Sequence, residues 1–435
     1  MKGVVMRNGK SAIYIIKLLL IVLIFSGCSY ESKTTATQNI SGILPTTTSI
    51  PTKDNEVVLP TITETITTNS EQPSFKYESI KIVNNIDQLP TIVGSLVLAN
   101  TSSYDVSNII IWDMVSKKEI EIPNEYVEIF AVSPKMNYLA YSSSSLEQDI
   151  LKDHGIIIMN SDGTIIDTLS DIEPGVSFKW KDEQELMINS YMEENPLILY
   201  SPFTKSTQTI LPYFQESEIV FFDKDLIRLW NFYAQHKNVY NPTFTRVIFP
   251  TNDEQGPKIV LRDLTSETDL ASFPTYIEWG VDPSWSTNGD KFAIGIETNP
   301  SSIQGDFSKY EIFLIDQNGD LIQKTNYASI SDSFYILYLS WSPDNRYIAF
   351  SFSRNTDNYY DNIELGVFDT STQETAFYQI TTPSEYVPIW SPDSRFIVLK
   401  TAYPKENGTN SLIIDITTNQ GLIIKEGYEP IGWLN

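Results

Sequence analysis

The sequence predicts an all-β protein, a seven-bladed β-propeller that follows a signal peptide and a linker. A ten-residue motif recurs along the chain, as WSPDNRYIAF from Trp341 and WSPDSRFIVL from Trp390. Between its copies lie short apolar runs that end in an acid or amide and are followed by turn residues. Repeats of about 40–50 residues with four strands and an aromatic signature are typical of propeller blades.

Weaker copies of the motif continue the repeat toward the N-terminus, at a mean spacing of about 50 residues. The anchor positions are Val132, Trp180, Tyr240, Trp285, Trp341, Trp390 and Trp433. Trp180, Trp285, Trp341, Trp390 and Trp433 are interpreted as structural residues of the repeat.

Each part of the unit has a local reason. The aromatic residue ends a first strand, and Ser-Pro-Asp-Gly then forms a tight turn, because proline presets φ and Asp or Asn bonds the nearby backbone. A second strand follows, then a third and a short fourth, which together form an antiparallel meander. The third strands are expected to end at Asp113, Asn160, Asp263, Asp316, Asp369 and Asp415.

The two ends of the repeat are incomplete in complementary ways. The first unit has no motif strand ahead of Leu96 and Val97, and the last motif strand, around Trp433, has no blade after it. We therefore expect the C-terminal strand to complete blade one, which closes the ring and hides its open edges. A six-bladed ring stays open as the alternative if residues 217–275 do not form a blade.

Over about residues 90–435 the repeat resembles the TolB-like, WD-repeat-like β-propeller family, whose signature is Trp-Ser-Pro-Asp-Gly-x-x-Ile-Ala-Phe. The blades at 283–382 and 386–426 match it best, and those around 177–275 diverge. This resemblance implies contact with proteins of the cell envelope. It does not by itself imply a function, because one fold carries many functions.

The N-terminus has the pattern of an export signal. Basic residues precede a short apolar run, followed by FSGCS around Cys28, the only cysteine. The stretch resembles the lipobox of bacterial lipoproteins, although Phe25 stands where that family prefers leucine. The resemblance implies removal of residues 1–27 and a lipid on Cys28, hence a membrane anchor on the extracytoplasmic face. An ordinary cleaved signal with a chance cysteine is the alternative.

The next segment, residues 28–80, is rich in Thr, Ser and Pro and has no sustained apolar period. Such a composition buries too little apolar surface to offset the entropy of ordering, so a disordered tether is expected. The propeller domain is then residues 81–435.

Charge and composition exclude several classes of function. The 55 acidic residues against 30 basic ones repel nucleic-acid backbones, so no nucleic-acid partner is expected. Only two histidines are present, and neither lies near a nucleophile motif or a metal-ligand pattern. We assign no catalytic residue, no metal and no cofactor.

The expected binding face follows from where the long connections lie. Turns between first and second strands are short, whereas insertions gather between second and third strands, at 142–155, 297–310, 353–362 and 401–410. Loops held by a rigid scaffold commonly carry binding residues. The candidates on these loops and on the blade-to-blade loops are Tyr126, Tyr276, Phe307, Asp357, Tyr359, Tyr360, Asp361, Tyr386, Tyr403 and Tyr428.

The sequence thus predicts a monomeric, membrane-anchored propeller lipoprotein that acts as a non-catalytic binding module for a protein or glycan of the cell envelope. The alternative is a carbohydrate-active or lyase-type enzyme that uses Asp or Glu at the channel mouth. A third interpretation is a purely structural envelope spacer. The sequence leaves open whether the membrane is an inner or an outer one.

Overall fold

The structure is a computed structural model in which the chain divides into two units, Met1–Asn69 and Ser70–Asn435. All described residues belong to the second unit. They are 77–100, 108–122, 126–147, 150–170, 177–189, 197–210, 241–243, 245–253, 256–273, 284–298, 309–331, 333–354, 363–382, 387–401, 410–424 and 427–435. The signal peptide, Cys28 and the linker up to residue 76 lie outside this set. Within it, no helix is long and apolar enough to span a bilayer.

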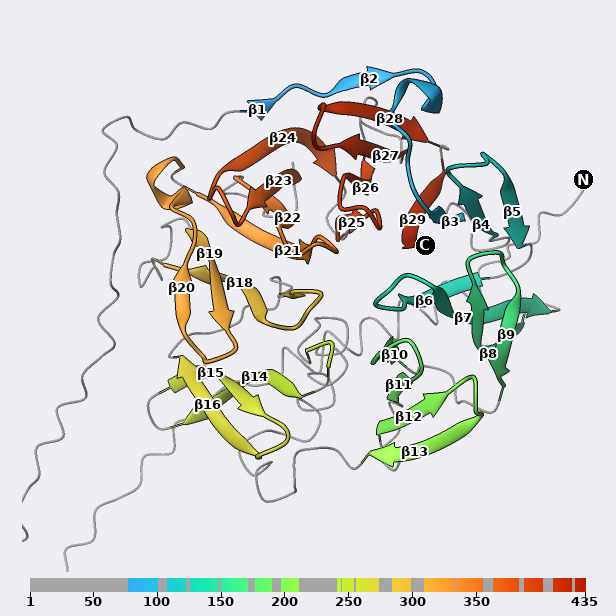
Figure 1. The fold of residues 1–435 in the computed structure, drawn as a ribbon, viewed down its shortest axis with the longest axis horizontal. Coiled ribbons are helices and arrows are strands. Elements are labelled where there is room, and N and C mark those ends of the chain that lie inside the picture. The colour runs from blue at the N-terminus through green and yellow to red at the C-terminus, as the bar shows by residue number, and fades with distance from the viewer. Residues whose placement is uncertain are drawn as a thin grey trace, which may run out of the picture. The chain divides into compact units, whose positions relative to one another are not determined.

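The second unit is a seven-bladed β-propeller, as predicted (Figure 1). One of its sheets lies at residues 246–273, so the six-bladed alternative is wrong. The first three blades, each written from the inner to the outer strand, have these strands. Blade 1 contains β29 (Tyr428–Leu434), β3 (Ser95–Asn100), β4 (Ile109–Asp113) and β5 (Glu119–Ile122). Blade 2 contains β6 (Tyr126–Val132), β7 (Tyr138–Glu147), β8 (Ile150–Asn160) and β9 (Ile165–Leu169). Blade 3 contains β10 (Ser177–Trp180), β11 (Leu186–Asn189), β12 (Leu197–Ser201) and β13 (Ser206–Ile210).

The remaining blades follow the same order. Blade 4 contains β14 (Arg246–Asp253), β15 (Gly256–Asp263) and β16 (Thr268–Phe273), and its expected anchor Tyr240 lies outside the described residues. Blade 5 contains β17 (Ser284–Trp285), β18 (Lys291–Glu297), β19 (Tyr310–Asp316) and β20 (Leu321–Gln323). Blade 6 contains β21 (Tyr335–Trp341), β22 (Tyr347–Ser353), β23 (Ile363–Asp369) and β24 (Thr375–Thr382). Blade 7 contains β25 (Ile389–Trp390), β26 (Phe396–Thr401), β27 (Asn410–Asp415) and β28 (Gln420–Ile424).

The ring closes as the two incomplete repeats predict. β29, the C-terminal strand, pairs antiparallel with β3, and Trp433 lies opposite Leu96 and Gly432 opposite Val97. The first blade therefore takes its innermost strand from the end of the chain and its other strands from the beginning.

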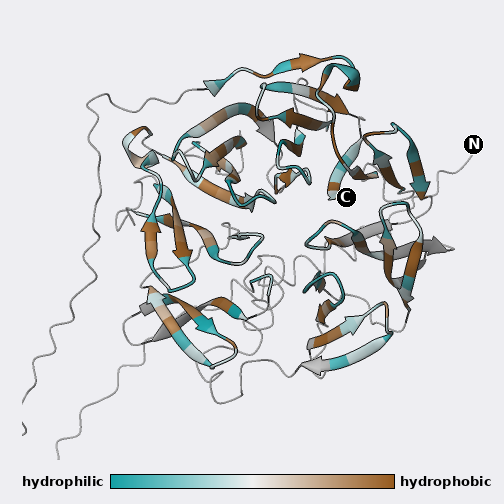
Figure 2. Cartoon of the chain, viewed as in Figure 1, coloured by the Kyte–Doolittle hydropathy of each residue, from teal (hydrophilic) through white to brown (hydrophobic). Residues whose placement is uncertain are grey.

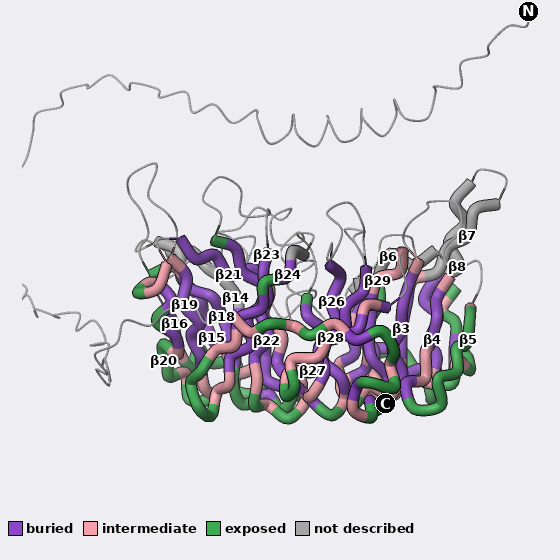
Figure 3. Tube along the Cα trace, turned by 90° about the horizontal axis from the view of Figure 1, so that it is seen from above, coloured by how far each residue is buried: buried purple, intermediate pink, exposed green. Residues whose placement is uncertain are grey.

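The core lies between neighbouring blades, since each sheet is covered on both faces. In β23, Phe368 belongs to one hydrophobic cluster, whereas Leu365 and Val367 belong to another that extends into blade 7. Burial on both faces explains why the third strands are continuous apolar runs instead of alternating ones. Figure 2 shows these apolar strands between hydrophilic turns, and Figure 3 shows the exposed residues gathered in turns at one side of the unit.

Two features differ from the sequence analysis. Residues 142–155 are largely paired, because β7 continues to Glu147, which lies opposite Ile150 of β8. The expectation of a loop there was wrong, since a run of serines has no apolar alternation to indicate a strand. Two further strands, β1 (Tyr77–Glu78) and β2 (Lys81–Val83), add to blades 6 and 7, and β1 lies in the segment expected to be linker. Two 3-10 helices, η1 (Ile86–Gln88) and η3 (Tyr327–Ser329), complete the described elements.

Candidate binding face

The strand order gives the propeller two different faces. The first-to-second and third-to-fourth turns leave the strands on one side, here called the turn face. The second-to-third and blade-to-blade connections leave on the opposite side, here called the loop face. The predicted binding residues belong to the loop face, so the question is how each face is built.

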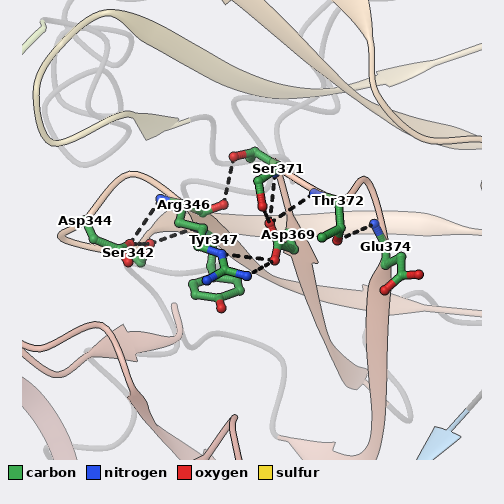
Figure 4. A network of polar contacts seen from close by, with 9 residues as sticks. Ser342, Asp344, Arg346, Tyr347, Asp369, Ser371, Thr372 and Glu374 are labelled. Carbon is green, nitrogen blue, oxygen red and sulfur yellow. Dashed lines mark hydrogen bonds and ion pairs between the residues drawn. The ribbon is translucent and has the colours of Figure 1, made fainter.

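The turn face is closed by its own hydrogen bonds (Figure 4). In blade 6, Ser342 donates from Oγ to Asp344 at 2.5 Å and accepts the N–H of Tyr347 at 2.8 Å. The Arg346 guanidinium then reaches Asp369 at the end of β23, 2.7 Å away. Ser-Pro-Asp and the strand-end acid thus form one network that uses their polar groups internally.

The strand-end acids are turn caps, as the sequence indicates. Asp369 accepts the backbone N–H groups of Ser371 and Thr372 at 2.8 and 3.3 Å. Partial burial works to raise the pKa of Asp369, but the hydrogen bonds from Arg346 and Ser371 outweigh it and lower that pKa to about 2. The same capping of following backbone N–H groups occurs at Asp113, Asn160, Asp263, Asp316 and Asp415.

The signature tryptophans join each blade to the one before it. The indole N–H of Trp341 donates to the carbonyl of Ser284 at 3.0 Å, and that of Trp390 donates to Ser340 at 3.0 Å. Trp180 makes the equivalent bond to Ala131, at 3.1 Å. Every acceptor directly precedes the anchor of the preceding blade, so the repeat signature is structural.

At the loop face, two of the predicted binding residues lie in described strands. Tyr126 begins β6, opposite Ser144, and Tyr428 begins β29, opposite Asn100. Both positions are loop-face ends of innermost strands, in blades 2 and 1. The half-buried Tyr428 donates from its hydroxyl to Asn108 at 3.2 Å. The other candidates, Tyr276, Phe307, Asp357, Tyr359, Tyr360, Asp361, Tyr386 and Tyr403, lie outside the described residues.

The sequence analysis missed a second polar position of the repeat. Most third strands carry a polar residue at their loop-face start, although the rest of the strand is apolar. These residues are Asn108, Lys258, Glu311, Glu364 and Asn410, each five positions before the strand-end acid. A polar residue at the same place in several apolar runs was the signal that could have identified them.

Glu364 holds the start of the connection that carries Tyr359 and Tyr360. Its carboxylate accepts two bonds from the Arg354 guanidinium, at 3.0 and 3.2 Å, and one from the Tyr77 hydroxyl, at 2.6 Å. Arg354 also lies over the Tyr77 ring, 5.3 Å from its centroid. Burial, and then the neighbouring Glu364 carboxylate, raise the pKa of Tyr77, which keeps the phenol protonated as the donor. This cluster fixes both ends of residues 355–362.

Glu311 performs the same task in blade 5, beside the connection that contains Phe307. Its carboxylate accepts bonds from Thr325 and from the backbone of Tyr327 and Ala328, at 2.6 to 2.8 Å. Burial raises the pKa of Glu311 against the effect of these bonds. All its printed partners are donors that hold η3 in place, so we interpret Glu311 as a positioning residue.

The loop face is also tied together across the closure of the ring. Lys400 in β26 forms an ion pair with Glu429 in β29, and the two side chains are only 10% and 13% exposed. Ser411 donates to the carbonyl of Tyr428 at 2.7 Å. Within the part of the chain that the structure describes, no group of His, Cys, Asp and Glu side chains is placed to hold a metal ion.

Comparisons with known proteins agree with the fold and go no further. No family model and no curated protein matches the chain. TolB from Acinetobacter baumannii is similar in structure at 14% identity and a TM-score of 0.40, over 79% of this chain and 67% of that one. The β-propeller domain of Myceliophteria thermophila Cps50 (Swd1) is similar at 12% identity and a TM-score of 0.40, over 76% of this chain and 95% of that one.

Proposed function

We propose that this protein is an extracytoplasmic lipoprotein, anchored by Cys28, whose propeller binds a protein or glycan of the cell envelope through its loop face without catalysis. The observation that carries the proposal is the difference between the two faces. The turn face uses its polar groups in its own networks, whereas the candidate connections begin at strand ends fixed by clusters such as Arg354, Glu364 and Tyr77. Rigid strand ends can hold binding loops in place at low entropic cost.

The composition of the connections supports a binding role. Residues 355–362 contain Asp357, Tyr359, Tyr360 and Asp361, and tyrosine offers rigid contact area with a polar tip. The acid excess of the whole chain favours a partner with a basic surface over an anionic one.

Replacing Tyr359 and Tyr360 together with alanine is expected to weaken partner capture by at least about tenfold, because aromatic anchors contribute most of the energy of an interface. The measurement is cross-linking and pull-down of the full chain from its own envelope, followed by titration of the captured partner. Val115→Ala, at an exposed apolar side chain on the turn face, is the matched control and should bind as the wild type. Equal capture by all three proteins would contradict the assignment of the loop face. Turnover in a glycan-cleavage screen would instead support the enzyme alternative.

Replacing Cys28 with serine is expected to move the protein from the membrane fraction to the soluble fraction, because a thioether-linked lipid cannot form on serine. Acyl chains contribute about 0.8 kcal/mol for each buried methylene, so their loss removes the anchor. Fractionation and radiolabelled fatty-acid incorporation measure this directly, and thermal unfolding should be unchanged. Membrane retention of the Cys28→Ser protein would show that the lipobox interpretation is wrong.

A further inference from the structure

Residues 77–93, here called the strap, run outside the blades before the chain enters blade 1 (Figure 1). β1 pairs in parallel with β24 of blade 6, and β2 pairs in parallel with β28 of blade 7. Among the described strands, these two blades alone have a fifth strand. The strap therefore covers two sheet edges that would otherwise be open, although it follows the blades only over short stretches.

Specific side chains attach the strap to both blades. In blade 6 the Tyr77 hydroxyl bonds to Glu364, as described above. Next to it, Glu78 accepts a bond from Asn419 of blade 7 at 3.0 Å, and Asn419 accepts one from Tyr378 of blade 6 at 3.0 Å. The backbone N–H of Lys81 donates to the carbonyl of Asn419 at 2.9 Å. The strap thus crosses the boundary between blades 6 and 7.

The strap also contacts the elements that close the ring. Val83, Leu89 and Ile92 lie in one buried cluster with Trp433 of the closing strand. The indole N–H of Trp433 donates to the carbonyl of Val93 at 3.0 Å, whereas the other signature tryptophans with a described bond use the preceding blade. Asp87 pairs with Lys117 of blade 1.

We propose that the strap is a second closure of the propeller, which joins blades 6, 7 and 1 from the outside and supports the pairing of β29 with β3 from within. Both closures pack into one cluster and share the Trp433–Val93 hydrogen bond, so their contributions to stability are coupled. Release of the strap from β28 then loosens β29, although the two do not pair as strands. A pull on the chain from residue 76 reaches the strap before it reaches any blade.

Gly421 in β28 offers a selective way to displace the strap. A Cβ at this position would lie 2.6 Å from Cγ2 of Ile80 and 3.2 Å from Cδ1 of Ile82, both in the strap. We expect Gly421→Ala in the full chain to speed hydrogen–deuterium exchange in β29 and β3 by at least about tenfold, because local opening there becomes easier. Ile80→Ala added to Gly421→Ala makes room for the new methyl group and should restore slow exchange. Peptides of β11 and β12 in blade 3 serve as the unchanged reference.

Two results would overturn the proposal. One is faster exchange in the strap alone, with β29 as protected as in the wild type. The other is faster exchange in β29 that Ile80→Ala does not restore, because the effect would then arise inside blade 7. If Gly421→Ala does not fold, Tyr77→Ala replaces it, since this change removes the contacts with Glu364 and Phe377 at a distance from the blade 7 core. Faster exchange in β29 of Tyr77→Ala supports the second closure, and unchanged exchange there rejects it.

Discussion

Replacing Trp433 with alanine is expected to lower the free energy of unfolding by about 3–5 kcal/mol, the range for truncating a large buried aromatic residue. The side chain is 1% exposed and packs in the cluster shared by blades 7 and 1. The substitution also removes the indole donor to Val93. It acts on the only strand that joins the C-terminus to blade 1, so the ring itself is weakened. Denaturant unfolding followed by tryptophan fluorescence and circular dichroism measures the loss.

The control for this prediction is Val115→Ala, because Val115 is 61% exposed on a turn of the same blade. This change should alter stability by less than about 0.5 kcal/mol. A loss below about 1 kcal/mol in Trp433→Ala would mean that closure by β29 contributes little to stability, contrary to the fold described above.

Replacing Asp415 with alanine is expected to cost about 3 kcal/mol, because it leaves the Arg395 guanidinium without its partner. Asp415 is fully buried and accepts two bonds from Arg395, at 2.9 and 3.1 Å, and others from Thr417 and Thr418. Arg395 is about one-third exposed, 34%, so water relieves part of the penalty and the loss falls at the lower end of the range for buried pairs. Chemical denaturation at neutral pH measures it.

Asp316 provides a matched control at the same position of blade 5. It caps its turn through the N–H groups of Asn318 and Asp320, and the motif residue that would pair with it is Lys291 instead of arginine. Asp316→Ala should therefore cost only about 1 kcal/mol, the typical net value of hydrogen bonds. Equal losses at Asp316 and Asp415 would show that the arginine contributes nothing.

The same pair gives a pH dependence with a definite sign. Burial works to raise the pKa of Asp415, but the bonds from Arg395 and Thr418 lower it overall, as they do for Asp369, whose pKa is about 2. A carboxylate with a folded-state pKa below its unfolded value stabilises the fold above about pH 4, and this stabilisation is lost toward pH 2. The wild type should lose more stability between pH 5 and pH 2.5 than Asp415→Ala does, at about equal ionic strength.

Much of this propeller could be predicted from local patterns. Ser-Pro-Asp turns and strand-end acids depend on neighbours in the sequence, so each unit repeats the same signal, and the closure by Trp433 followed from two incomplete units. The hairpin at 142–155 was missed because its pairing leaves no apolar alternation in a run of serines. The loop-face residues Glu311 and Glu364 were missed because their partners come from other segments.

The sequence by itself determined the repeat, the number of blades expected, the turn chemistry and the order of strands, because these arise from interactions within a few residues or from apolar periodicity. Only the tertiary structure decided which carbonyl each tryptophan meets, and that the chain before blade 1 attaches to blades 6 and 7. Tyr77 and Glu364 are 287 positions apart, and Trp433 and Val93 are 340 apart. Contacts over such separations depend on how the closed ring brings the blades together, and no local pattern records that geometry.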